Sequence, residues 1–576
     1  MKSLIKIISF FVLAHILTAC VVEVASAEAV ESSSSSSTSS SASSDSDSSD
    51  DVVSSATGSS YSADSYIYIN LSDKTWSEDN ASWTSITSDS ETVSLSDSVV
   101  IKVDLTEIEK KMGVVLKGSL SSGGVKIQTN PSYETGLYLN NVTIYSTNYP
   151  CVDITKGGAA TVFLTGSNVL VDGREYGTGY GSDYESTSVN YEEEGSDNKG
   201  SLFCKGGLTI CESSSSASLT ITQAYKNCIA SKDGILTVES GSLSLKNYTS
   251  SSETGKNGLF GGQGIIVNGG SITFDGKGII STSDVRKANA FKTDDENYTS
   301  SYVKITGGTV DVTTYNGKGI SAPVVAISGG NNTFNVTGTT SYSSDSSGSS
   351  KSYSWYDADG VQESGTITYS PEGIEGESSV SISGGYTIVS AYDDGINVSA
   401  TGGKLSVSGG FLYVSAKGDG IDSNGNITIS DGIVVVSQTG NNNSPIDCGD
   451  GSYKFTVTGG TVFAMGGSGM FSESIPSSTS NPMIYSTSLG SSSSSLGVDG
   501  IIAVESPQTY AAAILISSSL TSGSSYAFVK GGEISGTEYV SGSGVYYPAS
   551  LSGGSEVSVT AGTSASSTSH GKPGGR

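Results

Sequence analysis

Apolar and polar residues alternate over short segments from residue 66 onward. Segments such as YIYINL and VVIKVDL place an apolar side chain at every second position, which is the period of a β-strand with one buried face. Gly-Gly, Asp-Gly and Asn-Gly pairs separate the segments, as turns between strands do. One piece, LTEIEKKM at residues 105–112, favours a helix that could cover an open end of the fold. The pattern predicts an all-β protein.

A sequence unit recurs over residues 371–450. Each copy has an isoleucine with acidic residues beside it, then an alternating strand, a turn and a second strand. Successive isoleucines are 22, 25 and 25 residues apart. A fixed period in this range is typical of a solenoid, and three short strands per repeat fit a parallel β-helix. The isoleucines that define the unit are Ile374, Ile396, Ile421 and Ile446.

The same rhythm extends upstream with looser spacing, over residues 200–340. Two stretches without a period interrupt it. We expect residues 173–200 to protrude as a loop and residues 338–370 to form a polar insertion. The residues that we align with the later isoleucines are Leu202, Ile229, Leu259, Phe291 and Ile320.

Acidic residues recur at two positions of the unit. Equivalent positions of a solenoid stack about 4.8 Å apart. Two stacked carboxylates then repel by roughly 1 kcal/mol in bulk water and by about 3–4 kcal/mol at an effective dielectric of 20. Cations between them would remove this cost, and hard oxygen ligands suit Ca²⁺. The predicted calcium ligands are Glu372, Glu375, Asp393, Asp394, Asn397, Asp419, Asp422 and Asp447.

Two observations bear on this calcium hypothesis. Asp-Gly and Asn-Gly are also ordinary turn dipeptides, so turn chemistry explains any single acid. It does not explain two aligned rows. The positions flanking Ile320 are Lys318 and Ser321, so the rows belong to the last coils and not to the repeat in general. This restriction favours a site over a folding requirement.

The units DDGIN, GDGIDSNG and NNNSPIDCGD, each followed by a strand and a turn, carry a family resemblance. The segment from GVVLKGSL to VLVDG matches the first coils of the same family. The chain resembles the clostridial-type carbohydrate-binding domain. The resemblance implies a right-handed parallel β-helix of pectate-lyase-like shape, calcium ions on acidic side chains, and binding to cellulose and acidic polymers such as pectin. A similar C-terminal β segment would cap the solenoid.

Aromatic and basic residues near the acidic unit suggest further roles. Tyr353, Trp355 and Tyr356 precede it, and exposed rings there could stack on the flat faces of sugars or fold back on the solenoid. If the protein were a lyase acting by β-elimination, Lys417 or Lys404 would be the base. Ordinary solvated lysines are the simpler interpretation of both.

Composition restricts the function further. The net charge is −28, which argues against nucleic acid and anionic membranes as partners. The two histidines are His15 and His570, near the ends of the chain, so the body has none for a triad, a zinc site or a general base. This predicts sugar binding that does not change between pH 6 and 8.

The ends of the chain predict export. Residues 1–27 form a signal segment, with either a lipobox that would place a lipid on Cys20 or an A-x-A cleavage after Ala27. Residues 28–65 are a Ser-rich disordered linker, residues 66–565 the β-helix with its cap at about 466–565, and residues 566–576 a disordered tail. The five other cysteines match no metal motif. Cys204, Cys211 and Cys228 could pair or stay as buried thiols.

We therefore expect an extracellular or surface-displayed, calcium-dependent carbohydrate-binding protein that is not an enzyme. It would be a monomer that binds polysaccharide and meets the membrane only through a lipid anchor. Two other classes stay open, a calcium-dependent polysaccharide lyase and an adhesin or structural solenoid without a sugar ligand.

Overall fold

The computed structural model describes residues 61–79, 81–96, 99–146, 149–172, 199–250, 253–280, 285–338, 340–344, 351–356, 362–366, 371–439, 442–490, 494–508 and 510–564. The chain falls into two units, Met1–Asp51 and Val52–Arg576, and every described residue belongs to the second. No helix among the described residues is long and apolar enough to cross a membrane.

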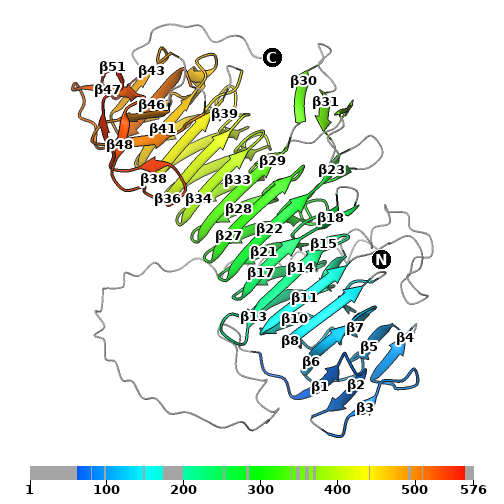
Figure 1. The fold of residues 1–576 in the computed structure, drawn as a ribbon. Coiled ribbons are helices and arrows are strands. Elements are labelled where there is room, and N and C mark those ends of the chain that lie inside the picture. The colour runs from blue at the N-terminus through cyan, green and yellow to red at the C-terminus, as the bar shows by residue number, and fades with distance from the viewer. Residues whose placement is uncertain are drawn as a thin grey trace, which may run out of the picture. The chain divides into compact units, whose positions relative to one another are not determined.

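Most strands join one large, mostly parallel sheet that is organised as three ladders (Figure 1). Consecutive strands of the chain fall in different ladders, and the chain returns to the same ladder one layer further on. We call one such passage through the three ladders a coil. The first ladder contains β5 (Val100–Asp104), β7 (Gly124–Gln128), β9 (Val152–Thr155), β12 (Gly200–Cys204), β15 (Asn227–Ser231), β20 (Leu259–Gly261), β25 (Phe291–Thr293), β28 (Ile320–Ile327), β33 (Ile374–Ile382), β35 (Ile396–Val398), β37 (Ile421–Ser423) and β39 (Ile446–Cys448).

The second ladder uses the later parts of β28 and β33, eight strands of its own, and the first parts of four long strands, β6, β8, β36 and β38. These are β1 (Ser65–Asn70), β6 (Met112–Leu120), β8 (Thr135–Ser146), β10 (Ala160–Thr165), β13 (Leu208–Glu212), β16 (Ile235–Val238), β21 (Gly264–Val267), β26 (Tyr302–Ile305), β36 (Lys404–Ala416), β38 (Asn426–Gln438), β40 (Phe455–Val457) and β42 (Ser478–Thr479).

The third ladder receives the ends of β6, β8, β36 and β38 after a turn within each strand. Its other members are β11 (Ser167–Asp172), β14 (Ser218–Gln223), β17 (Ser242–Lys246), β22 (Ser271–Lys277), β27 (Thr309–Tyr315), β29 (Asn331–Thr337), β34 (Tyr386–Ala391) and β41 (Thr461–Gly466).

The alternating pattern of the sequence is the reason for this arrangement. Every second side chain of a strand is buried in one cluster that runs through successive coils. In the first ladder the predicted alignment is confirmed, because each predicted residue pairs with the next in register and is 0% exposed. The aligned residues are Leu202, Ile229, Leu259, Phe291, Ile320, Ile374, Ile396, Ile421 and Ile446.

Insertions leave the coils at one corner, between the third ladder and the next strand of the first. Figure 1 shows labelled strands of these insertions along one side of the coils. The insertions are the pair β18 (Tyr248–Ser250) and β19 (Glu253–Thr254), the pair β23 (Ile279–Ile280) and β24 (Val285–Arg286), and a sheet of β30 (Thr340–Ser344), β31 (Lys351–Tyr356) and β32 (Gln362–Thr366). The expected polar insertion thus contains an antiparallel sheet.

The N-terminal end of the ladders is covered by strands and not by a helix. β2 (Thr75–Glu78) and β3 (Thr84–Ser85) extend β1 as antiparallel strands, and β4 (Val93–Ser96) pairs with β5. The helix predicted at residues 105–112 is wrong, since these residues form turns that lead into β6. Asp104 favours a turn because it accepts hydrogen bonds from the Thr106 amide and hydroxyl at 3.1 and 2.6 Å.

The C-terminal segment packs against the outer face of the last coils. β41 pairs antiparallel with β46 (Ala512–Ser517), which also pairs with β43 (Met483–Ser486). A second apolar cluster joins Phe411 and Ile433 of the coils to the C-terminal strands. Those strands are β44 (Ser495–Val498), β45 (Ile502–Glu505), β47 (Ser525–Lys530), β49 (Val545–Tyr546) and β51 (Ser555–Thr560). The C-terminal segment also contains the pair β48 (Glu533–Ser535) and β50 (Ser550–Ser552) and a short 3-10 helix, η1 (Phe471–Ser474).

Four cysteines of the coils, Cys151, Cys204, Cys211 and Cys228, are buried thiols, and Cys448 is half-buried. Burial raises the pKa of Cys204 to about 12 and that of Cys211 to about 11, so both thiols are protonated and unreactive at neutral pH. The structure therefore favours the buried-thiol interpretation over pairing between coils.

Candidate functional site

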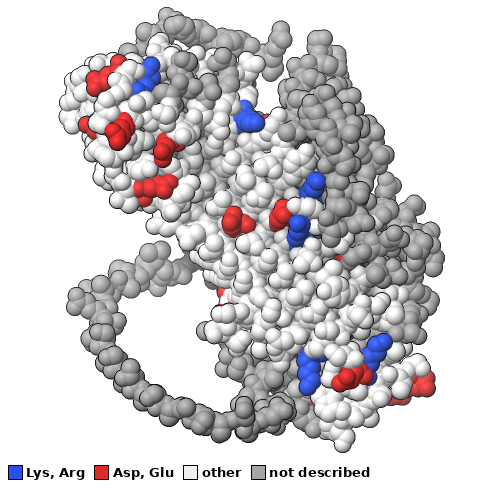
Figure 2. Space-filling model, viewed as in Figure 1, with Lys and Arg blue, Asp and Glu red and all other residues white. Residues whose placement is uncertain are grey.

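Charged side chains are sparse over the coils on the face shown in Figure 2, whereas acidic residues gather over the C-terminal strands. The predicted acidic rows lie within the coils, at the corner where a third-ladder strand leads into the first ladder. Insertions lie at this corner before β20, β25 and β33, whereas the connections into β15, β28, β35, β37 and β39 are short. The rows begin directly after the last of these insertions.

Both predicted rows are confirmed as stacked columns. In one column Glu375, Asn397, Asp422 and Asp447 occupy paired positions of β33, β35, β37 and β39. The other column contains Glu372, Asp394, Asp419 and Ser444, which follow one another through backbone hydrogen bonds. The Gly373 amide donates to the Asp394 carbonyl at 2.9 Å, and the Gly395 amide donates to the Asp419 carbonyl at the same distance.

A lysine closes the columns on their N-terminal side. Lys318 Nζ lies 3.0 Å from Glu372 Oε2 and 2.7 Å from Glu375 Oε2, and its side chain is 11% exposed. Burial alone would lower the pKa of Lys318, but the two carboxylates outweigh it and raise the pKa. Burial would likewise raise the pKa of Glu375, yet Lys318 and the Ser321 hydroxyl hold it below its usual range. Aligning the repeats of this chain with one another showed that Lys318 and Ser321 replace the acidic residues in this coil. It did not predict that both side chains contact the glutamates.

The described residues of the next coils supply no such cation. Among the described residues, no lysine or arginine lies within ion-pair distance of Asp394, Asp419, Asp422 or Asp447. Burial, and after it the charges of Asp393, Asp419 and Glu372, raises the pKa of Asp394 well above its ordinary value. These carboxylates repel one another in the way that the stacking predicted.

Three of the pKa values fall in the neutral range. Burial raises the pKa of Asp419 to about 7, although the Ser444 amide donates to its Oδ1, and raises that of Asp422 to about 6. Burial and the charge of Glu473 raise the pKa of Asp447 to about 8. The absence of histidine led us to expect sugar binding that does not change between pH 6 and 8. That expectation stays a prediction, and it took no account of buried carboxyl groups with pKa values in this range.

Glu473 is a member of the site that the sequence did not reveal. It lies in η1, outside the repeat, and its Oε2 accepts a hydrogen bond from Ser444 Oγ at 2.8 Å. The same hydroxyl lies 2.9 Å from the Met470 carbonyl. No periodic signal could place Glu473 here, because the contact depends on how the chain turns back after β41.

Two features leave room for a ligand among the oxygens. Asn397 Nδ2 donates to Glu372 Oε1 at 3.0 Å, but Asn397 Oδ1 is buried and has no partner. A Cβ at Gly418 would lie 2.7 Å from Asp393 Oδ1 and closer still to Asp394 Oδ1, so only glycine leaves this space open. In the part of the chain that the structure describes, no three His, Cys, Asp or Glu side chains are yet arranged to hold a metal ion.

The remaining predicted residues do not join the columns. Lys404 begins β36 on the second ladder and is exposed. Lys417 is also exposed, with its Nζ 4.4 Å from the centre of the Tyr392 ring. Tyr353, Trp355 and Tyr356 belong to β31, but their side chains lie outside the described residues, as does Cys20 with the whole of residues 1–60.

Comparison with known proteins gives the class of this chain. A family model described as carbohydrate-binding domain-containing protein matches residues 104–401 and 359–538, which is most of the chain. The chain belongs to this family. It also resembles the solved structure of the polysaccharide lyase-like protein from C. thermocellum, a gadolinium derivative, with 16% identity, a TM-score of 0.33, and coverage of 63% of this chain and 96% of that one. No curated protein matches the chain.

Proposed function

We propose that this chain is an exported, calcium-dependent carbohydrate-binding protein that holds plant cell-wall type polysaccharides without cleaving them. The observation that carries the proposal is the pair of acidic columns. Lys318 pairs with the first two glutamates, and no described lysine or arginine lies within ion-pair distance of the aspartates that follow. Family membership supports the carbohydrate part of the proposal. The calcium part is supported by the charges, burial and oxygen chemistry of the columns.

The oxygens of the columns suit a calcium ion. Asp394, Asp419, Asp422 and the partnerless Oδ1 of Asn397 offer hard, mostly anionic oxygens, which Ca²⁺ prefers. Small shifts of these half-buried side chains would bring them onto a common ion. When bound, calcium would supply the positive charge that neutralises the columns and could attract the carboxylates of a uronic-acid polymer. Asp393, Asp447 and Glu473 would form the edge of the site.

The solenoid would supply the surface. We assign it as a right-handed parallel β-helix over residues 66–565, with a C-terminal β cap over about residues 466–565. Three stacked ladders and the antiparallel pairing of β46 on the last long parallel strand support this assignment. A monomer released from its signal segment, or anchored through a lipid on Cys20, would present this surface outside the cell.

A lyase is the second candidate. Its base would have to reach the α-proton of a uronate beside the bound cation. Lys404 lies on another ladder, and the Lys417 ammonium stacks on Tyr392, so neither side chain points to an assembled catalytic centre. Of the two lysines, only Lys417 is near an acidic column in the sequence, two residues before Asp419. The non-catalytic function is therefore preferred, and an adhesin without a sugar ligand is the third alternative.

A depletion assay tests the proposal. The full chain is mixed with insoluble cellulose or crosslinked polygalacturonate, in calcium and then in chelator, and the protein left in solution is measured. We expect retention on polygalacturonate that the chelator abolishes. Retention on neither matrix would refute carbohydrate binding and leave the adhesin.

A further inference from the structure

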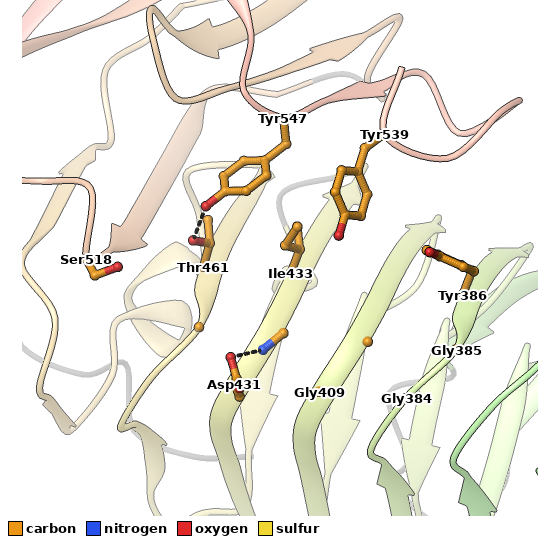
Figure 3. A pocket seen from close by; sticks show the side chains of 13 residues that line it. Gly384, Gly385, Tyr386, Gly409, Asp431, Ile433, Thr461, Ser518, Tyr539 and Tyr547 are labelled. Carbon is orange, nitrogen blue, oxygen red and sulfur yellow. Dashed lines mark hydrogen bonds between the residues drawn. The ribbon is translucent and has the colours of Figure 1, made fainter. Parts of the chain in front are cut away.

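A groove lies at a different corner of the coils, between the second and third ladders (Figure 3). It has a volume of about 560 Å³. Its floor is made by the turns of successive coils, and its wall by tyrosines from the C-terminal segment, which lie above the floor in Figure 3. The groove is separate from the acidic columns, which lie where the third ladder leads into the first.

The floor is bare backbone because the turns stack closely. Gly385 and Gly410 have φ of 74° and 78°, in the left-handed region that favours glycine. A Cβ at Gly410 would lie 2.7 Å from the Gly385 carbonyl oxygen of the coil below. Stacking thus explains these glycines without any ligand. Its consequence is a strip of peptide groups that side chains do not cover.

Among the described strands of the third ladder, an aromatic ring stands at the position after this turn only in the last coils. The position that follows the turn is Thr309 in β27 and Asn331 in β29, but Tyr386 in β34. Tyr386 is 44% exposed, although small polar residues would serve the fold there as they do upstream. The next two coils have Phe411 and Ile433 at this position, both buried under the C-terminal segment. The change of side chain therefore coincides with the groove.

Tyr539 forms the opposite side of the groove and is held in place by packing. Its ring centre lies 5.5 Å from that of Phe411 and 6.0 Å from that of Tyr547, the second at an interplanar angle of 83°. Tyr547 is fixed in turn by a 3.4 Å contact between its hydroxyl and Thr461 Oγ1. Tyr539 is nevertheless 42% exposed. Within the described residues, neither Tyr386 nor Tyr539 uses its hydroxyl in a hydrogen bond.

We propose that this groove binds a short segment of a neutral saccharide chain between Tyr386 and Tyr539. This inference rests on the carbohydrate-binding function proposed above and adds a second, calcium-independent site to it. The flat C–H faces of pyranose rings stack on exposed aromatic rings, and the volume is within the roughly 300–1,000 Å³ of small-ligand sites. Peptide groups of the floor would bind sugar hydroxyls.

The charge of the groove selects a neutral chain. Asp431 is the one charged residue among the residues that line the groove, and its Oδ1 accepts a hydrogen bond from the Gly432 amide at 2.7 Å. A carboxylate repels uronates but accepts hydrogen bonds from the hydroxyls of a neutral sugar. No lysine or arginine among the lining residues would offset that repulsion.

The test is calorimetric titration of the full chain with cellohexaose in the presence of chelator. We expect Tyr386→Ala and Tyr539→Ala each to weaken binding by about fivefold to tenfold, and Tyr386→Phe to change it by less than about twofold. Tyr145→Ala is the matched control, because Tyr145 is a 49% exposed tyrosine of β8 in an early coil of the third ladder. The Tyr145→Ala variant should bind cellohexaose with the affinity of the wild type. Melting curves confirm that each variant is folded.

The outcomes separate this inference from the function on which it rests. If the wild type binds cellohexaose and the groove variants bind as well as Tyr145→Ala, the groove is refuted and carbohydrate binding stands. An equal loss in the control variant also refutes the groove, since binding would then be spread over the surface. If the wild type binds polygalacturonate but not cellohexaose, the neutral-chain assignment is wrong. Binding to neither sugar refutes both proposals.

Discussion

Lys318 and Glu375 form a buried ion pair with 2.7 Å between Nζ and Oε2, and this pair closes the acidic columns at one end. Glu372 shares the same ammonium. The lysine shows what the columns require, because the two glutamates that contact it are compensated and the aspartates of the following coils are not. We propose that calcium takes the place of Lys318 in those coils.

Removing the lysine should destabilise the protein strongly. In Lys318→Met two buried carboxylates lose their cation, and breaking a buried pair from one side costs about 3–5 kcal/mol. We expect a clearly lower melting temperature in thermal unfolding followed by circular dichroism. Lys404→Met, on the exposed second-ladder position, is the control and should melt like the wild type. Equal melting temperatures for the two variants would show that the pair does not compensate the columns.

Replacing two aspartates should uncouple stability from calcium. Asp394→Asn with Asp419→Asn removes two charges while the side-chain oxygens that accept backbone amides remain. In chelator we expect this variant to melt at or above the wild-type temperature, because repulsion is reduced. Calcium should raise the melting temperature of the wild type but not that of the variant. Asp311→Asn, on an exposed position of β27, should keep the full calcium response.

The chelated protein should lose stability as the pH rises. Asp419, Asp422 and Asp447 have folded pKa values of about 7, 6 and 8, all above the ordinary value near 4 of the unfolded chain. Between these values the folded state binds more protons than the unfolded state, so the free energy of unfolding falls from about pH 4 to about pH 8 and then levels off. Calcium should flatten this slope. Stability in chelator that rises over the same window would contradict the burial of these carboxyl groups.

The protein should not cleave a uronate polymer. β-Elimination creates an unsaturated product that absorbs in the ultraviolet, and we expect no new absorbance when the wild type is incubated with polygalacturonate and calcium. If absorbance appears and is lost in Lys417→Met, the lyase replaces the binding function. Product formation that survives Lys417→Met would exclude Lys417 as the base, and the same assay on Lys404→Met would then test the second lysine.

The repeat could be predicted from the sequence, but the residues that contact the two ends of the acidic columns could not. Isoleucine recurs at a fixed position, so Ile374 to Ile446 could be stacked from spacing alone, and the acids beside them followed. Lys318 contacts Glu372 across the insertion at residues 338–370, and Glu473 reaches Ser444 from outside the repeat. Tyr386 and Tyr539 meet at the groove only because the C-terminal segment folds back on the coils. Such contacts depend on three-dimensional packing that carries no periodic signal.

Burial also changed the chemistry that composition suggested. A body without histidine should have no group that titrates near neutrality, by the ordinary pKa values. Stacking partly buried carboxylates on successive coils raises the pKa of Asp419 and Asp447 into that range. The sequence showed that the acids align, but the extent of their burial and the contact of Asp447 with Glu473 came from the fold.

Isothermal calorimetric titration of the calcium-free wild-type protein with calcium decides whether the acidic columns bind the ion. We predict a saturable binding isotherm that is lost in the Asp394→Asn, Asp419→Asn variant and kept in Asp311→Asn. Magnesium should bind more weakly, because it demands a more regular oxygen octahedron. A wild-type isotherm without binding, or one that the double substitution leaves unchanged, would contradict the assignment of the acidic columns as a calcium site.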